Sequence, residues 1–243
     1  MRDYQKECDA RVAFIRSVLK DAGAQGIVYG NSGGKDSALV GILCKKACDN
    51  TLGVIMPCQT RRGFEQDRDD ALAVANQYGI ETVTVDLSEA KASLCTALSG
   101  AALLTAQADV NIAPRLRMTT LYAVAQSRNA LVAGTGNRSE GYLGYFTKWG
   151  DGAYDLNPIA DLTVTEIYEF LEFLNAPDVI CTKAPSAGLY DGQTDEQEMG
   201  IAYKQVDDYL ITGQCDDPQA LAKIEAMHKK SEHKRRPARK FGE

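Results

Sequence analysis

Short apolar segments bounded by turn residues alternate along this chain with longer segments of helical periodicity, and this alternation restricts its fold most. Apolar residues at helical spacing over positions 12–19 end at Gly23, and the apolar segment GIVYG follows. The pattern recurs, with helices expected over 36–48, 63–78 and 114–128 and strands over 51–56, 82–86 and 130–134. Strands that alternate with helices pair in parallel through right-handed crossovers. The sequence therefore predicts an α/β fold, an open parallel sheet with helices on both faces.

The size and composition of the chain are those of an ordinary globular domain. It has 243 residues, 44% hydrophobic and 25% charged, with no internal repeat and no low-complexity linker. We therefore expect a single domain over residues 1–243 with a basic C-terminal tail over 228–243. No apolar run approaches the ~18 residues of a membrane span, and the polar N-terminus lacks a secretory pattern. We expect a cytoplasmic protein with no membrane partner.

Charge and side-chain inventory exclude several classes of function. The tail carries seven basic residues against two acids, so the rest of the chain has a net charge of −11 against a total of −6. An acidic body argues against a nucleic-acid partner, and the tail is either a solvated terminus or a phosphate-binding element. The seven cysteines form no C-x-x-C pair and are interpreted as reduced thiols. With only two histidines, His228 and His233, a His-based zinc site or a Ser/His/Asp triad is disfavoured.

The loop after the first strand carries the strongest functional signal. It comprises Gly30, Asn31, Ser32, Gly33, Gly34, Lys35, Asp36 and Ser37. Glycines let the backbone approach a ligand closely, and the following helix N-terminus offers unpaired amides, so phosphate is the expected ligand. The loop lacks the Walker A spacing, and Asp36 would repel phosphate unless a divalent cation, most simply Mg²⁺, lies between them. The alternative is a glycine-rich turn in which Asp36 caps the helix.

These residues resemble a known family. SGGKDS has the S-G-G-x-D-S form of the ATP pyrophosphatases, which cleave ATP between its α and β phosphates. Four later segments are similar, in order and spacing, to those of NAD synthetases: NIAPRLRM, GTGNRSEGYLGYFTKWGDGAYDLNPI, KAPSAGLYDGQTDEQEMGIAYKQVDDYL and SEHKRRP. The resemblance extends from about Tyr4 to Arg236 and implies an adenine nucleotide alpha hydrolase-like, Rossmann-like fold.

The resemblance also implies a reaction. The carboxylate of deamido-NAD attacks the α-phosphate of ATP, pyrophosphate leaves, and ammonia then displaces AMP from the acyl adenylate to give NAD. Direct condensation of carboxylate with ammonia would need oxide as a leaving group, and adenylation replaces it with AMP. A glycine-rich amide cradle and Mg²⁺ suit the charge that develops on pyrophosphate.

Carried over residue by residue, the resemblance assigns three groups of ligands. Gly30 through Ser37, Thr135 and Ser186 contact ATP; Asp36 and Glu140 are catalytic and hold Mg²⁺; Arg115, Lys148, Asp155, His233 and Lys234 contact deamido-NAD. Each has a plainer interpretation outside its motif. Glu140 would be an exposed acid at a helix start, Arg115 a helix-surface cation, and Lys148 and Asp155 a local ion pair.

One position departs from the family pattern. Val164 stands where the family commonly has a lysine that reaches an ATP phosphate. The variable position of the phosphate loop is Lys35, and we hypothesise that its charge replaces the missing one. A related expectation concerns the basic tail, whose many charges predict little core burial.

Size and resemblance also bear on partners. The chain has no room for the glutaminase domain that some NAD synthetases carry, so we expect ammonia itself as nitrogen donor, free or delivered by a separate glutaminase subunit. The resemblance implies a homodimer, and closed two-fold pairing is the commonest oligomer. Two alternatives remain: another ATP pyrophosphatase-type amidotransferase or ligase, and a non-catalytic nucleotide sensor.

Overall fold

The computed structural model describes residues 2–58, 64–185 and 194–242. Its sheet has four parallel strands in the order β3-β2-β1-β4. They are β1 (Gly26–Gly30), β2 (Thr51–Ile55), β3 (Glu81–Thr84) and β4 (Ala130–Ala133). This confirms the expected open parallel sheet, and it brings the carboxyl ends of all four strands to one edge.

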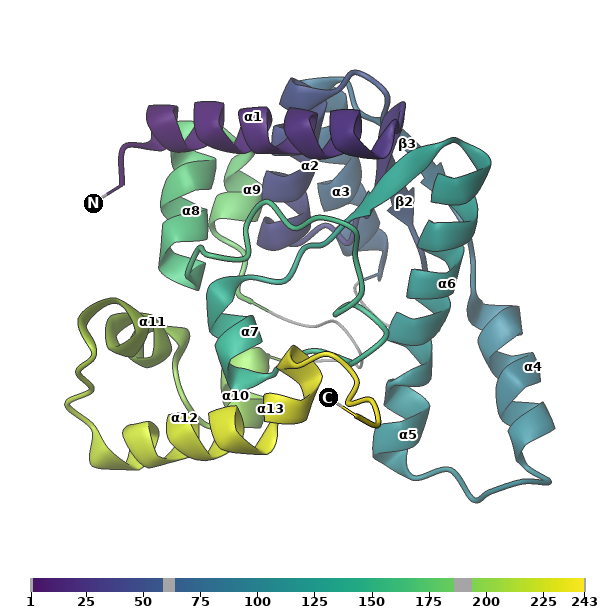
Figure 1. Cartoon of the computed structure of the whole chain (residues 1–243), viewed down its shortest axis with the longest axis vertical. Coiled ribbons are helices and arrows are strands. Elements are labelled where there is room, and N and C mark those ends of the chain that lie inside the picture. Colours follow the sequence, from purple (N-terminus) through teal and green to yellow (C-terminus); the bar gives the residue numbers. More distant parts are fainter. Residues whose placement is uncertain (1, 59–63, 186–193, 243) are drawn as a thin grey trace.

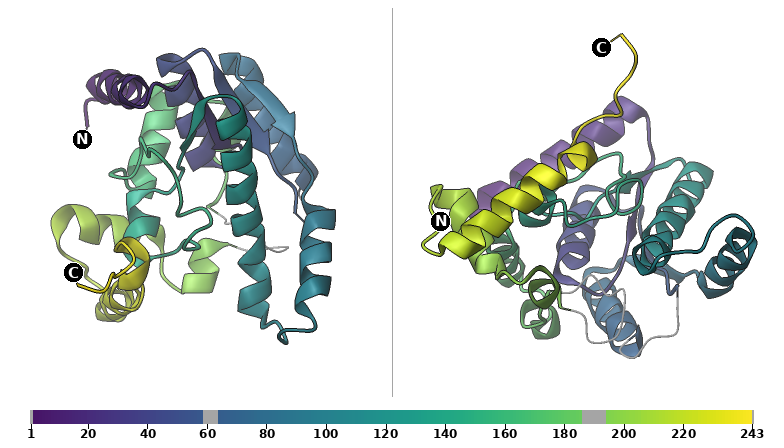
Figure 2. Two further views of the ribbon diagram at one scale, coloured as in Figure 1. Left: turned by 45° about the vertical axis from the view of Figure 1, so that its right-hand side comes forward. Right: turned by 90° about the horizontal axis from the view of Figure 1, so that it is seen from below.

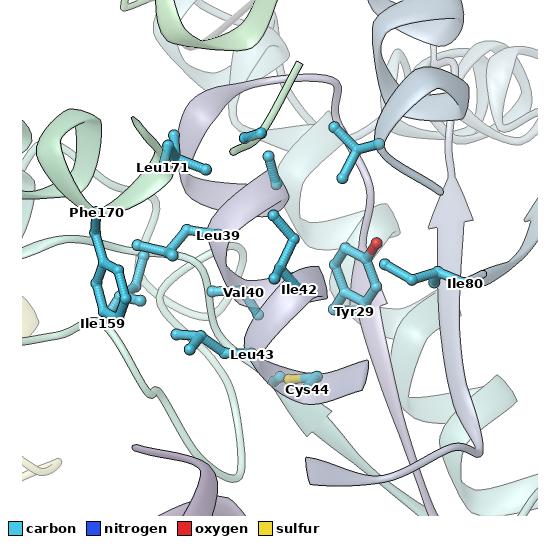
Figure 3. Packing of buried hydrophobic residues seen from close by; sticks show 14 of the residues in the cluster. Tyr29, Leu39, Val40, Ile42, Leu43, Cys44, Ile80, Ile159, Phe170 and Leu171 are labelled. Carbon is cyan, nitrogen blue, oxygen red and sulfur yellow. The ribbon is translucent and has the colours of Figure 1, made fainter. Parts of the chain in front are cut away.

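Helices cover both faces of the sheet (Figure 1). One face packs against α1 (Tyr4–Ala22), α2 (Lys35–Ala47), α3 (Phe64–Tyr78) and α8 (Val164–Phe173). The other packs against α6 (Ile112–Ser127), with α4 (Ser88–Leu98) and α5 (Ala106–Val110) beside it. Alternate residues of β1 serve the two layers: Ile27 and Tyr29 face α2, and Val28 faces α6. Figure 3 shows the larger core, where Tyr29 from β1 and Phe170 from α8 lie on either side of α2.

The helix ends follow local sequence signals. The Asp3 side chain accepts a hydrogen bond from the Lys6 amide at the start of α1, and Gly23 ends that helix with a positive φ of 64°. Gly79 ends α3 with the same φ. The third strand differs from its prediction, because it begins at Glu81 and ends at Thr84. It is the edge strand and its residues are mostly exposed, so apolar alternation marks its bounds poorly.

A second group of helices lies below the carboxyl edge of the sheet and was not predicted. It comprises α7 (Arg138–Leu143), α10 (Asp195–Met199), α11 (Tyr203–Thr212), α12 (Pro218–Lys230) and α13 (Glu232–Arg235). The short helix α9 (Asp178–Cys181) lies instead beside α2 and α8. Several helices of the group share a separate core cluster with Val164, which includes Leu143, Tyr203 and Ile224. Figure 2 shows α12 and α13 crossing beneath this group. No helix in the described part of the chain is long and apolar enough to cross a membrane.

Candidate active site

The glycine-rich loop joins β1 to α2 at the carboxyl edge of the sheet. Its hydroxyls form a compact network: Ser32 Oγ lies 3.0 Å from Ser37 Oγ, and Ser32 Oγ accepts a 3.3 Å hydrogen bond from the Gly34 amide. Gly34 is the N-cap of α2 and provides no side-chain cap. Among the described residues, no acceptor faces the amides of Lys35, Asp36 and Ser37. The loop therefore presents a helix N-terminus whose amides remain available to an anion.

Gly33 allows the close packing that shapes this loop. Its φ is +74°, and a Cβ atom there would lie 2.0 Å from the backbone oxygen of Asp67 on α3. Lys183 fixes the same contact from the other side, because its Nζ donates to the Gly33 carbonyl at 3.1 Å, to Asp67 at 2.8 Å and to Asp70 at 2.6 Å. Burial alone would lower the pKa of Lys183, but the hydrogen bonds to the two carboxylates outweigh it and raise the pKa.

A single buried amide connects the two predicted metal-binding acids. Asn137 Nδ2 donates to Asp36 Oδ1 at 3.0 Å, and Asn137 Oδ1 accepts from the Glu140 amide at 2.9 Å. The Glu140 side chain in turn accepts from the Asn137 amide at 3.2 Å, which completes a capping box at the start of α7. The structure thus brings Asp36 and Glu140 together, although they come from helices that follow different strands. Glu140 is both the helix-start acid of its plainer interpretation and a member of this cluster.

The cluster carries more negative charge than its partners neutralise. Burial and the charge of Asp36 raise the pKa of Glu140 well above its usual value. Burial also raises the pKa of Tyr203, together with the charges of Glu140 and Asp195. Within residues 2–58, 64–185 and 194–242, no group of three or more His, Cys, Asp or Glu side chains is placed to hold a metal ion. The carboxylates of Asp36 and Glu140 therefore form the acidic centre of the site.

Lys35 is the cation of this cluster. Its Nζ lies 2.7 Å from Asp36 Oδ2 and 5.9 Å from the centre of the Tyr203 ring, and its side chain is 5% exposed. Burial alone would lower the pKa of Lys35, but the charges of Asp36 and Glu140 outweigh it and raise the pKa. Val164 is 4% exposed and packs in the core cluster that contains Tyr203. Lys35 thus lies over an aromatic ring of the core cluster in which Val164 is packed.

Three of the residues expected to contact deamido-NAD lie together. Arg115 on α6 donates to the Lys148 carbonyl at 3.4 Å, and Lys148 Nζ donates to the His233 carbonyl at 2.6 Å. Lys148 Nζ also lies 5.3 Å from the centre of the exposed Trp149 ring. Lys234 points into the protein, where its Nζ donates to the carbonyls of Gly144 and Phe146 at 2.8 and 2.7 Å.

The remaining predicted residues have mixed placements. Asp155 does not pair with Lys148 in the structure; it accepts from the Val132 amide at 2.8 Å and from the Tyr122 hydroxyl at 3.2 Å. Thr135 lies half-buried in the loop between β4 and α7. Ser186 lies outside the described residues.

The basic tail is docked as far as Arg235. The buried Ser231 hydroxyl donates to the Leu143 carbonyl at 3.0 Å, and Arg235 donates to the Tyr142 carbonyl at 3.1 Å. Gly144 permits this contact, because a Cβ atom there would lie 2.0 Å from Ser231 Cβ. The expectation of little core burial is confirmed, because Ser231 is the one buried residue among the described positions 229–242 and none of them belongs to a hydrophobic core cluster. Hydrogen bonds, not apolar contacts, dock this segment against the end of α7.

Sequence reasoning missed three supporting residues, although all three stood inside quoted motifs. Asn137 is the fourth residue of GTGNRSE, and Lys183 is the first of KAPSAGL. Asp207 lies near the end of the same segment as Lys183: it is buried on α11, accepts from Ser139 at 2.5 Å, and accepts from the amide and hydroxyl of Thr165, each at 2.7 Å. It thereby ties α7, which carries Glu140, to the start of α8.

The chain is similar to known proteins over nearly its whole length. The family model for NAD synthase matches residues 7–238. An NH3-dependent NAD+ synthetase from Carboxydothermus hydrogenoformans is 46% identical, with 96% of each chain covered. The solved structure of NMN synthetase from Francisella tularensis is 36% identical with a TM-score of 0.93 over 100% of both chains. NH3-dependent NAD synthetase from Campylobacter jejuni is 31% identical with a TM-score of 0.81, over 99% of this chain and 100% of the other. The chain belongs to the NAD synthase family.

Proposed function

We propose that this chain is an ammonia-dependent NAD+ synthetase, which amidates deamido-NAD with ammonia and converts ATP to AMP and pyrophosphate. The family match supports this activity over another ATP pyrophosphatase and over a non-catalytic sensor. The observation that carries the proposal is the Asp36–Asn137–Glu140 arrangement beside the open amides of α2. It combines a phosphate cradle with two acids at the edge where parallel sheets bind ligands.

The acids fit a magnesium ion. Mg²⁺ is usually held by one or two carboxylates together with substrate phosphates, so a pair of acids without a third ligand suits it. Burial and the charge of Asp36 raise the pKa of Glu140, and a divalent cation between the two acids would offset their mutual repulsion. Asp36 and Glu140 would hold the ion, and Mg²⁺ bound there would neutralise charge that develops on the pyrophosphate.

The protein groups have distinct tasks in the reaction. Gly30 through Ser37 bind the phosphates through backbone amides and hydroxyls, with Thr135 and Ser186 completing the ATP site. The carboxylate oxygen of deamido-NAD forms a bond to the α-phosphorus, and the bond to pyrophosphate breaks. Ammonia then attacks the acyl carbon and AMP leaves with the shared oxygen. Holding the two substrates in one crevice supplies much of the rate by orientation.

The dinucleotide side of the site rests on Arg115, Lys148, Asp155, His233 and Lys234. Arg115, Lys148 and His233 already adjoin one another, which supports a shared ligand. Lys234 acts on that ligand partly by fixing the carbonyls of Gly144 and Phe146. The expected homodimer rests on the resemblance to NAD synthetases, and sedimentation showing a fully active monomer would exclude it.

The direct assay supplies ATP, Mg²⁺, ammonium and deamido-NAD and measures NAD. We expect NAD to form with ammonium and not with glutamine in ammonia-free reagents, because the NAD synthase family model accounts for residues 7–238 and the similar curated proteins are NH3-dependent. Equal rates with the two nitrogen donors would overturn this part of the proposal.

A second candidate function is the amidation of a mononucleotide. It is favoured by the TM-score of 0.93 to NMN synthetase, against 0.81 to the NAD synthetase from Campylobacter jejuni. The acid that corresponds to NMN, nicotinic acid mononucleotide, has the same reacting carboxylate. The ratio of kcat/KM for the two acids decides between them, and a ratio above one for deamido-NAD supports the first candidate.

A further inference from the structure

The phosphate loop contains a cation at the position that the S-G-G-x-D-S form leaves variable. The Lys35 ammonium reaches Asp36 Oδ2 at 2.7 Å, on the carboxylate whose other oxygen accepts from Asn137. The lysine side chain is 5% exposed and the aspartate side chain 17%. The ammonium therefore binds one of the carboxylate oxygens that would coordinate a divalent cation.

Burial makes this contact consequential. A buried ammonium needs a nearby anion, and here Asp36 and Glu140 provide the negative charge. The face of the Tyr203 ring adds a weaker attraction at 5.9 Å. If the Asp36 carboxylate binds a metal ion instead of Lys35, the Lys35 ammonium loses its closest partner unless another anion takes its place. The phosphates of ATP, bound to the same loop, are such an anion.

We propose that Lys35 is a tethered counter-ion of the Asp36–Glu140 pair, which weakens metal binding until ATP accepts the ammonium. The inference rests on the proposed function, because it takes these two acids as the metal-binding pair. A divalent cation must displace the ammonium from Asp36, and bound ATP lowers the cost of that displacement. ATP and metal therefore bind with positive coupling, and each strengthens the other by the same factor.

Loss of the Lys35 charge should have opposite effects on the two ligands. Without ATP, a neutral side chain leaves both acids free, so a divalent cation binds more tightly. With ATP, the same change removes an ammonium from the phosphates and weakens their binding. A side chain that merely fills space above Tyr203 would give neither effect.

The test measures Mn²⁺ binding by the paramagnetic resonance signal of the free ion, in the protein without ATP. Lys35→Met keeps the apolar stem and removes the charge, and we expect it to bind Mn²⁺ about 10- to 100-fold more tightly than wild type, as for loss of a charge-assisted contact. Lys35→Arg should stay near wild type. Lys91→Met is the matched control, because Lys91 is equally buried and pairs with Asp109 at 3.0 Å outside the phosphate loop; it should change nothing.

Two further measurements make the outcome decisive. Asp36→Asn in the Lys35→Met background should remove the gain, and a non-hydrolysable ATP analogue should improve Mn²⁺ binding more in wild type than in Lys35→Met. Should Lys35→Met not fold, Lys35→Gln enters the same comparison. Unchanged or weaker Mn²⁺ binding in a folded variant overturns the inference. If wild type binds no Mn²⁺ even with the analogue, the metal site of the proposed function fails instead.

Discussion

At the scale of single residues, the site depends on charges that come from distant parts of the chain and meet around one amide. Asn137 links Asp36 and Glu140, which stand 104 positions apart in sequence: its side-chain amide donates to the Asp36 carboxylate and its backbone amide donates to the Glu140 carboxylate. Lys35 neutralises part of their charge. Such a cluster is costly in an empty site because the acids repel each other. Because the repulsion between the two acids must be offset for the site to form, we expect turnover to depend strongly on each of them.

Neutral, isosteric changes at the two acids should abolish turnover and leave the fold intact. We expect Asp36→Asn and Glu140→Gln each to lower kcat by about 10²- to 10³-fold or more, because each removes charge that stabilises the transition state. Steady-state kinetics at saturating Mg²⁺, with circular dichroism of each variant, measure this. Near-normal turnover of either variant at limiting Mg²⁺ would contradict its assigned role.

The pairing of Lys35 with Val164 gives a double-variant prediction. A cation beside ATP phosphates contributes on the order of 1.5 to 3 kcal/mol, or about 10- to 100-fold in affinity. Lys35→Gln should raise the KM for ATP by about that factor, and Val164→Lys in the same background should restore much of it. If Lys35→Gln is silent, or if the double variant gains nothing, the two positions do not compensate.

Single residues also mark where sequence reasoning reached its limit. Asp36 and Glu140 were predictable as neighbours, because both follow strands whose carboxyl ends share an edge. The amide of Asn137 was not, because only the fold shows that one side chain touches both acids. The inward direction of Lys234 was equally hidden, since its acceptors are backbone carbonyls that carry no residue signature.

At the scale of elements, the helix–strand alternation gave reliable predictions wherever apolar periodicity was strong. α2, α3 and α6 lie within about two residues of their expected bounds, as is usual for helix ends, whereas α1 begins at Tyr4, well before the apolar positions 12–19 that predicted it. The helices α10 to α13 were not predicted, because they are rich in charged residues and because their apolar residues pack on one another and on α7 rather than on the sheet. The helix α9 has only four residues, which is too few to show a periodic pattern. The positions of these helices depend on tertiary contacts such as the hydrogen bonds of Asp207 to Ser139 and Thr165.

The tail gives the first prediction at this scale. Deletion of residues 229–243 should lower both turnover and thermal stability, because it leaves the carbonyls of Leu143 and Gly144 without their donors. Two unsatisfied groups of this kind cost about 2 kcal/mol or more. Deletion of residues 237–243 is the matched control, since those described up to 242 are exposed. Unchanged melting temperature in the longer deletion would show that the docking contributes nothing.

Docking of α1 gives a pH-dependent prediction. Arg11 donates to both oxygens of Asp161, at 2.6 and 2.9 Å, and to the Pro158 carbonyl. Burial alone would raise the pKa of Asp161, but the hydrogen bond and charge of Arg11 outweigh it and lower the pKa below 3.8. A lowered pKa means that the carboxylate stabilises the fold above pH 3.8 and that this stabilisation disappears as the pH falls through the lower, folded-state pKa.

Asp161→Asn should therefore destabilise the protein at pH 7 by about 1 kcal/mol, a discounted figure because the side chain is 55% exposed. The difference from wild type should shrink as the pH falls below 3.8. Urea unfolding at several pH values measures it. A difference that stays constant across the pH range would show that the ion pair does not account for the effect.

At the scale of the whole molecule, the sheet and the lower helix group face each other across the site. The sheet provides the phosphate loop and the start of α7, and the lower group provides Tyr203 and the docked tail. The fold class and the edge that carries the site were predictable, because parallel pairing follows from alternation alone. The contacts made by the lower helix group were not predictable, because no periodic pattern in the sequence indicates them.

The most direct test of the whole account follows the oxygen of the reacting carboxylate. Deamido-NAD labelled with ¹⁸O in that carboxylate is converted with ATP and ammonium, and the products are analysed by mass spectrometry. If the carboxylate attacks the α-phosphorus, one labelled oxygen appears in AMP for each NAD formed, and pyrophosphate stays unlabelled. Label in pyrophosphate, or formation of ADP and phosphate in place of AMP, would contradict the adenylation on which every assigned residue role depends.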